Sequence, residues 1–245
     1  MKPAIKVLGV PDDINSSFMR GSSAAPPLIR EALYSASSNL FSESGLNLDQ
    51  KGIWEDLGDI EFAGEVAVEN FKKIKTFVKD VLVSDQKLVS LGGDHSVSWP
   101  ILDAHLDKWD ALDILHIDAH PDLYDSLLGN KLSHASPFAR IMETGRASRL
   151  VQVGIRTLNK HQREQAEKFG VEIYQMKDLT KLNSLSFSKP VYCSIDIDAL
   201  DPAYAPGVSH FEPGGLSTRQ LIDCLNGFKG RLIGADIVEY NPKRD

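Results

Sequence analysis

The chain has 245 residues, of which 42% are hydrophobic and 25% are charged, and its formal net charge at pH 7 is -7. This length suits one large α/β domain, and the acidic balance argues against nucleic acid or an anionic membrane surface as the main partner, because both require a basic face. With no run of about 18 apolar residues and no secretion signal at the N-terminus, we expect a soluble cytoplasmic protein without a membrane partner.

Short apolar runs rich in β-branched residues recur along the chain and predict strands. In chain order, the eight runs span residues 5–10, 52–57, 87–91, 112–117, 150–155, 171–175, 191–197 and 232–238. Stretches with helical periodicity separate most of them, at residues 63–83, 97–106, 135–142, 161–169 and 218–228. Pro26 and Pro27 predict the start of a further helix.

This alternation predicts a largely parallel sheet covered by helices, with strands buried on both faces. The polar, serine-rich segments 12–23 and 35–49 are expected to be long surface loops. No linker rich in Pro, Gly or Ser divides the sequence, so residues 1–245 are expected to form a single domain.

Side chains suited to metal binding or catalysis follow four of the predicted strands. They are His95 after residues 87–91; Asp118, His120 and Asp122 after residues 112–117; Asp196 and Asp198 at the end of residues 191–197; and Glu239 after residues 232–238. The ligand site of a parallel α/β sheet forms beyond the carboxyl ends of its strands, so we expect these side chains to lie close together.

The segment D-A-H-P-D, residues 118–122, places three ligand-type side chains at alternate positions, where an extended chain turns them to one face. Asp196 and Asp198 repeat this spacing within S-I-D-I-D-A-L-D. Either group alone is compatible with surface acids or structural ion pairs. Together they favour a bound cation, because several buried carboxylates without one would be costly.

Six ligands with four carboxylates exceed what one tetrahedral ion takes, and no cysteine lies among them, which disfavours structural zinc. Two metal ions fit better, with Mn²⁺ as the first candidate and Fe²⁺, Co²⁺ or Ni²⁺ as alternatives. A pair of metal ions lowers the pKa of a water held between them, and this chemistry implies hydrolysis.

Four motifs occur in the order and spacing of a known family: G-G-D-H-S (residues 92–96), D-A-H-P-D (118–122), S-I-D-I-D-A-L-D-P (194–202) and E-Y-N-P (239–242). The chain resembles the ureohydrolases, the superfamily of arginases and agmatinases. Residues 129–140 and 205–217 look most like the plant-type arginases. The resemblance implies a three-layer αβα sandwich with an eight-stranded, mainly parallel sheet and two Mn²⁺ ions per chain.

The resemblance also implies the ligand sets. One ion would take His95, Asp118, Asp122 and Asp196, and the other His120, Asp118, Asp196 and Asp198, with Asp118 and Asp196 bridging. The histidine of the family's site falls on His134, and the glutamate that contacts the guanidinium group falls on Glu239.

These assignments predict a hydrolase that cleaves a small cationic guanidino substrate to urea and an amine, with L-arginine first and agmatine or another guanidino acid as alternatives. Asp122 is expected to hold the attacking water and pass on its proton. Glu239 is expected to orient the cationic headgroup, and His134 to exchange protons with solvent. Tyr124 and the sequence Thr157, Leu158 and Asn159 depart from the animal-type arginases where those bind the amino-acid end of the substrate.

Several polar residues near the motifs allow two interpretations. Asp94 either orients His95 or forms a local turn. His210 either lines the mouth of the site or belongs to a loop without a role. His105, His116 and His161 are expected to be structural or surface residues.

Two other classes of protein remain open. A zinc deacetylase of similar topology would use one metal ion and lack the doubled S-I-D-I-D-A-L-D arrangement, and a noncatalytic binding relative would have lost ligands. The sequence stops five residues beyond Tyr240, so the terminal helix typical of the family is expected to be missing. A trimer or hexamer is expected by resemblance.

Overall fold

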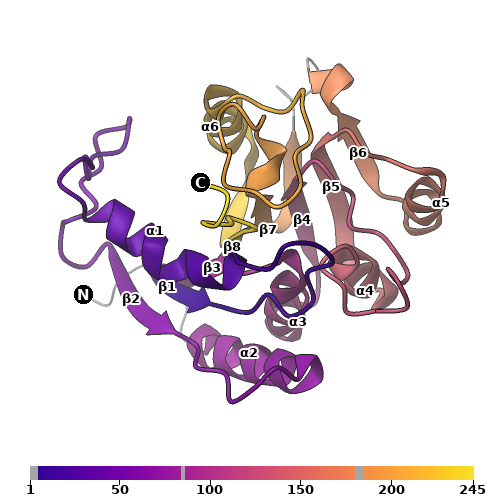
Figure 1. Cartoon of the computed structure of the whole chain (residues 1–245), viewed down its shortest axis with the longest axis horizontal. Helices are drawn as coiled ribbons and strands as arrows, with labels where there is room; N and C mark the ends of the chain where they lie inside the picture. Colours follow the sequence, from indigo (N-terminus) through magenta and orange to yellow (C-terminus); the bar gives the residue numbers. More distant parts are fainter. Residues whose placement is uncertain (1–4, 84–85, 180–184) are drawn as a thin grey trace.

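The computed structural model describes residues 5–83, 86–179 and 185–245, and these form one eight-stranded sheet (Figure 1). The strands are β1 (Ile5–Val10), β2 (Trp54–Asp59), β3 (Lys87–Gly92), β4 (Leu112–Ile117), β5 (Ala147–Ile155), β6 (Glu172–Gln175), β7 (Ser186–Asp196) and β8 (Lys229–Val238). Their order is β2-β1-β3-β8-β7-β4-β5-β6, and every pairing is parallel. All eight predicted strands are confirmed, with shifts of a few residues at their ends.

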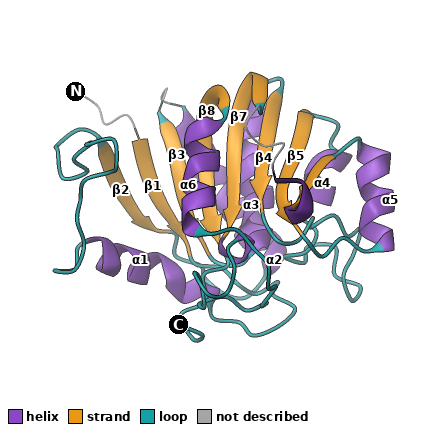
Figure 2. Cartoon of the chain, turned by 90° about the horizontal axis from the view of Figure 1, so that it is seen from above, coloured by secondary structure: helices purple, strands orange, loops and turns teal. Residues whose placement is uncertain are grey.

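Helices cover both faces of this sheet, which confirms the three-layer arrangement (Figures 1 and 2). Helices α2 to α5 lie on one face, and α1 and α6 lie on the other. Their bounds are α1 (Ala25–Leu33), α2 (Ala67–Leu82), α3 (Ser98–Lys108), α4 (Pro137–Glu143), α5 (Lys160–Phe169) and α6 (Thr218–Gly227). Each side has its own apolar core, which includes Ile74, Ile101 and Ile141 on the first face and Leu221 with Val191 on the second.

The helix ends follow from local sequence. Two prolines occupy the first turn of α1, where a missing backbone N–H costs little. Asn159 accepts a hydrogen bond from the backbone of Gln162 at the start of α5. Ser217 and Gln220 form a capping box at the start of α6, so the helix begins where this pair stands.

The middle of the sheet is the most deeply buried part. All six residues of β4 are buried, whereas β2 at the edge has no buried residue. A strand covered on both faces needs apolar side chains on both, so the nearly continuous apolar runs of the sequence fall on the central strands. Among the described residues, none of the helices combines the length and the apolar character that a membrane crossing requires.

Two predictions of local structure were wrong. The segment 12–23 is a loop, but not a surface loop throughout, because Asp12, Asp13 and Asn15 are buried beside the G-G-D-H-S motif. The predicted strand 191–197 runs one residue too far: β7 ends at Asp196, and residues Ile197–Ala199 form a 3-10 turn. The carboxylate of Asp196 accepts a hydrogen bond from the Asp198 backbone at 2.7 Å, which stops the strand and starts the turn.

Candidate metal centre

The four strands that carry the candidate residues are neighbours in the sheet. Their order is β3-β8-β7-β4, so the residues that follow them meet at one edge, as parallel strands require. The turn after β3 is compact because a side chain on Gly93 would lie 2.0 Å from the carbonyl oxygen of Asp12. Gly93 therefore lets the Asp12 backbone pack against this turn, where its carbonyl oxygen accepts from the Asp94 backbone N–H at 2.9 Å.

His95 is the centre of a first cluster of ligands. Its Nδ1 atom lies 3.1 Å from Asp118 Oδ2, 3.0 Å from Asp122 Oδ2 and 3.2 Å from Asp196 Oδ2. Despite these short distances, Nδ1 is buried and makes no hydrogen bond within the described part of the chain. One nitrogen and three carboxylate oxygens thus face a common point, and this donor set suits a divalent cation.

Contacts behind His95 fix which nitrogen faces the carboxylates. The Ser194 hydroxyl donates to Asp236 Oδ1 at 2.6 Å, and it lies 3.0 Å from His95 Nε2. Since the only hydroxyl proton of Ser194 is used, its oxygen accepts from the Nε2–H of His95. The lone pair of a neutral His95 ring is therefore on Nδ1, as metal ligation requires.

His120 is the centre of a second cluster. Its Nδ1 atom lies 3.0 Å from Asp198 Oδ2 and 3.4 Å from Asp118 Oδ1, and its Nε2 atom lies 3.5 Å from Glu212 Oε1. Asp118 thus turns one oxygen to each cluster, as a ligand shared by two metal ions would. Asp196 turns Oδ2 to the first cluster while its Oδ1 caps the following turn. A bridging role of Asp196 therefore stays a prediction.

The electrostatics of these buried acids favour a cation between them. Burial and the repulsion of neighbouring Asp198 raise the pKa of Asp196 well above its ordinary value. Burial also raises the pKa of Asp198. Burial opposes protonation of His95, but the adjacent Asp118 and the other carboxylates raise the pKa of its ring well above the usual value. The clusters attract positive charge, which a metal ion supplies more effectively than a proton.

Glu239 and His134 form a pair next to the first cluster. Glu239 Oε1 lies 2.8 Å from His134 Nδ1, and His134 Nε2 lies 2.9 Å from the Ser17 hydroxyl. Although burial lowers the pKa of His134, the Glu239 carboxylate raises it to about 9. The pKa lies above that of an unperturbed histidine because Glu239 contacts the ring directly.

Two of the acidic residues have a backbone conformation that residues other than glycine rarely adopt. Asp122 has φ 51° and Glu239 has φ 64°. Such strain persists only where the surrounding structure imposes it, and it gathers at functional sites. Both side chains are thereby aimed into a cavity of about 220 Å³ above the clusters.

This cavity contains most of the predicted site residues. It is lined by His120, Asp122, His134, Asp196, Asp198 and Glu239, with Tyr124, Thr157 and His210 around them, while His95 and Asp118 are fully buried. The interpretation of His210 as a residue of the site mouth is thus supported. Arg156 is not free to bind a substrate, because it donates to the carbonyl oxygens of Asp198 and Glu212 at 2.7 and 2.6 Å.

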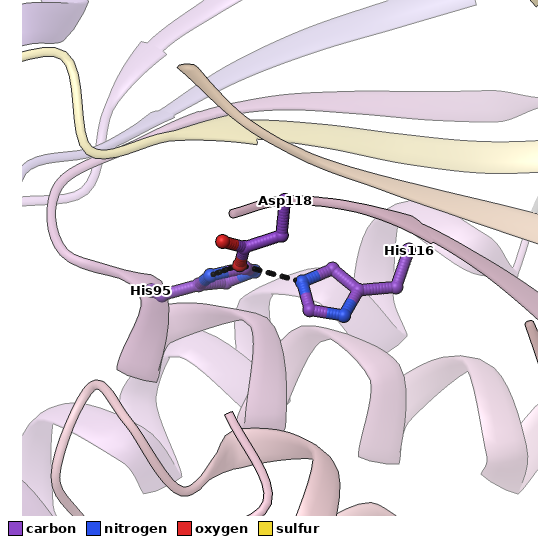
Figure 3. A group of neighbouring side chains, drawn as sticks. All are labelled: His95, His116 and Asp118. Atoms are coloured by element: carbon purple, nitrogen blue, oxygen red, sulfur yellow. Dashed lines mark hydrogen bonds and ion pairs between the residues drawn. The ribbon is translucent and has the colours of Figure 1, made fainter. Parts of the chain in front are cut away.

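Sequence reasoning missed several contacts of the site. His116, expected to be structural or at the surface, is buried with Nε2 2.7 Å from Asp118 Oδ2 (Figure 3). The signal was present, because residues 116 and 118 are two apart on an extended chain and share a face. Asp94 forms the predicted local turn, accepting from the backbone N–H of Ser96 at 2.9 Å.

Comparisons with known proteins agree with this geometry. The family model described as the arginase family matches residues 3–245. The chain is 47% identical to arginase 2, chloroplastic/mitochondrial, of Arabidopsis thaliana, over all of this chain and 75% of that protein. It is 34% identical to an agmatinase of Bacillus cereus, over 98% of this chain and 84% of that protein. A solved arginase structure from Medicago truncatula superimposes with a TM-score of 0.95 at 46% identity, covering 99% of this chain and 81% of that one.

Proposed function

This chain belongs to the arginase family, and on that premise we propose that it hydrolyses L-arginine to L-ornithine and urea with two Mn²⁺ ions. The observation that carries the proposal is the pair of clusters that share Asp118. His95 with three carboxylates forms one, and His120 with Asp118 and Asp198 forms the other. Ligands rich in oxygen with one imidazole each suit Mn²⁺ better than structural zinc.

The site residues have distinct roles in this proposal. A metal pair held by these residues would lower the pKa of a bound water and so make hydrolysis possible near neutral pH. Asp122, whose side chain faces the cavity beside His95, would orient the attacking water and take up its proton. The negatively charged carboxylate of Glu239 would attract the cationic guanidinium group and hold its carbon close to the water.

His134 completes the set as the proton carrier. It contacts Glu239 on one side and Ser17 on the other, and it lines the cavity. With a pKa raised to about 9, its ring is protonated at neutral pH and able to give a proton to the departing amine. The starting state would return once urea and the amine leave, Asp122 loses the proton it took up, His134 regains a proton from solvent and a new water enters the cavity.

We propose arginine ahead of agmatine as the substrate, because the plant arginase is more similar to this chain than the agmatinase is, at 47% against 34% identity. The decisive experiment measures urea release from arginine, agmatine, guanidinobutyrate and free guanidine in the presence of Mn²⁺. The fastest release is expected from arginine. Preference for agmatine would make the chain an agmatinase, and no urea from any of the four would refute the proposal.

A metal assay distinguishes the proposed arginase from a deacetylase-like zinc hydrolase. The proposal expects two Mn²⁺ ions per chain after loading, whereas a deacetylase-like hydrolase would hold one zinc ion. A single bound zinc together with hydrolysis of an acetylated amine would replace the proposal.

Three further statements stay predictions. They are that residues 1–245 form a single ureohydrolase domain, that the protein assembles as a trimer or hexamer, and that it is cytoplasmic. The relatives in Arabidopsis and rice are named chloroplastic or mitochondrial, so localisation needs its own experiment. Size-exclusion chromatography with light scattering tests the oligomer, and an active monomer would contradict it.

A further inference from the structure

His116 is the buried neighbour of the Asp118 carboxylate that faces both clusters. It lies near the end of β4, its ring is stacked on Phe138 with centroids 3.8 Å apart, and Nε2 is 2.7 Å from Asp118 Oδ2. On its other side, Nδ1 is 3.0 Å from the side-chain nitrogen of Gln152. Gln152 belongs to β5 and is paired with His116 in the sheet.

The orientation of the Gln152 amide is fixed by a backbone carbonyl. The same nitrogen, Nε2, lies 2.6 Å from the carbonyl oxygen of Pro121. A carbonyl oxygen only accepts, so the amide group must turn its NH₂ toward Pro121. Of the two hydrogens on that nitrogen, one serves Pro121 and the other points at His116 Nδ1.

This arrangement determines which nitrogen of the His116 ring carries the hydrogen. Since Nδ1 accepts from Gln152, it carries no hydrogen, and the ring hydrogen is on Nε2. The Nε2–H group then donates to Asp118 Oδ2, the oxygen that also faces His95 Nδ1 (Figure 3).

Distances alone would allow a different role for His116. Single atoms of His95, His116 and Asp118 lie within 4.8 Å of one another and form a group able to hold a metal ion. Ligation through Nε2 would move the ring hydrogen to Nδ1, where it would face the N–H of Gln152. Two donors would then oppose each other in a fully buried place, at a cost that ligation by Asp118 avoids.

We propose that His116 is a positioning residue for the metal pair, and that Gln152 selects the ring tautomer with which it holds Asp118. The donated hydrogen bond restrains the carboxylate so that Oδ2 stays at the His95 cluster and Oδ1 stays at the His120 cluster. Gln152 also anchors Pro121, which lies between His120 and Asp122, so one amide supports both the bridge and the ligand segment. The inference rests on the proposed function, because it assigns a task at the same metal site.

Two substitutions of His116 separate donation from packing. His116→Phe keeps an aromatic ring beside Phe138 but removes the donor, whereas His116→Gln places an amide nitrogen at about the reach of Nε2. Titration calorimetry with Mn²⁺ on the metal-free protein is expected to show about 10- to 100-fold weaker binding for His116→Phe. Recovery by His116→Gln to within a few-fold of the wild-type affinity is the expected rescue. Wild-type affinity in a folded His116→Phe variant would overturn the proposal.

A second measurement starts from the wild-type protein and does not depend on activity. Nuclear magnetic resonance of metal-free wild-type protein with ¹⁵N-labelled histidine is expected to show hydrogen on Nε2 of His116. In Gln152→Glu, the new carboxylate accepts from Nδ1 while Asp118 still accepts from Nε2, so a hydrogen is expected on both ring nitrogens. Hydrogen on Nδ1 in the wild type would refute the proposal. If the wild type shows the expected tautomer and binds Mn²⁺ but releases no urea, the proposed function fails while this inference stands.

Discussion

The carboxylate of Glu239 accepts a hydrogen bond from the backbone N–H of His95 at 2.9 Å, although 144 positions separate the two residues in the sequence. The contact joins the residue after β8 to the turn after β3, the neighbouring strand. The same oxygen of Glu239 contacts the His134 ring. A single carboxylate thus links His95, the predicted metal ligand, with His134, the proposed proton carrier, beside the cavity.

Replacement of Glu239 by glutamine is expected to weaken substrate binding and to change the charge of His134. The amide still accepts from the His95 backbone, but it cannot attract a guanidinium group as a carboxylate does. We expect kcat/KM for arginine to fall by about 10²-fold or more, by analogy with loss of an oriented electrostatic contact. The pKa of His134, now about 9, should fall toward its ordinary value. Unchanged kinetics with a normal circular dichroism spectrum would show that Glu239 does not orient the substrate.

Replacement of Asp122 by asparagine tests its role as the proton acceptor. Asparagine tolerates the positive φ of this position, so the fold is expected to survive. Loss of a general base typically reduces turnover by about 10²- to 10⁴-fold. Asp125→Asn, on an exposed acid three positions later, is the matched control and should retain urea release. Equal rates for the two variants would remove Asp122 from the mechanism.

Removal of metal should destabilise the folded protein. Without a cation, the buried carboxylates of Asp118, Asp196 and Asp198 repel one another. A ligand present at 100 times its Kd stabilises by about 2.7 kcal/mol, which corresponds to a rise in Tm of roughly 5–10 °C for a chain of this size. Differential scanning calorimetry with chelator and then with Mn²⁺ measures the shift. In Asp198→Asn, the metal-free protein should be more stable, and the rise in Tm on adding Mn²⁺ should be smaller. Identical Tm values of the wild type with and without metal would contradict the predicted metal site.

His105 should make stability depend on pH away from the site. It is fully buried on α3, its ring stacks on Trp109, and burial lowers its pKa from 6.5 to about 4. Between these pH values the unfolded chain binds one proton more than the folded chain. The free energy of unfolding therefore falls as pH drops from about 6.5 to about 4, by about 3 kcal/mol in total.

His105→Gln removes this proton and serves as the comparison. Urea unfolding in the presence of chelator, from about pH 7 to about pH 5, should show a steeper loss of stability for the wild type than for the variant. Parallel curves would mean that His105 is not buried in its neutral form.

The sequence was sufficient for much of the fold and for the candidate ligands. Apolar runs identified the strands because the sheet is buried on both faces, and the strand ends identified His95, Asp118 and Asp196 because parallel strands gather their carboxyl ends. The three residues do lie together around one point. The fold and the site were thus predictable where a local pattern is enough, namely an apolar run for a strand and a polar residue directly after it for the site.

Contacts between distant segments could not be predicted in this way. The Ser194 and Asp236 pair behind His95 depends on the register of β7 against β8, which no local pattern specifies. Burial of Asp12 in the segment 12–23 depends on Gly93, whose lack of a side chain admits the Asp12 backbone. Polar residues of such a segment look like a surface loop until the partner that buries them is known.

The order of the strands has a consequence for how the protein is made. β3 and β4 follow each other in the chain, but β8 and β7 lie between them in the sheet. His95 and Asp118 therefore belong to two wings that share no strand pairing while synthesis proceeds. Only after residues 186–238 have left the ribosome can the central strands join the wings and bring the two ligands together. The predicted metal ligands of the two wings therefore come together only when the sheet is complete.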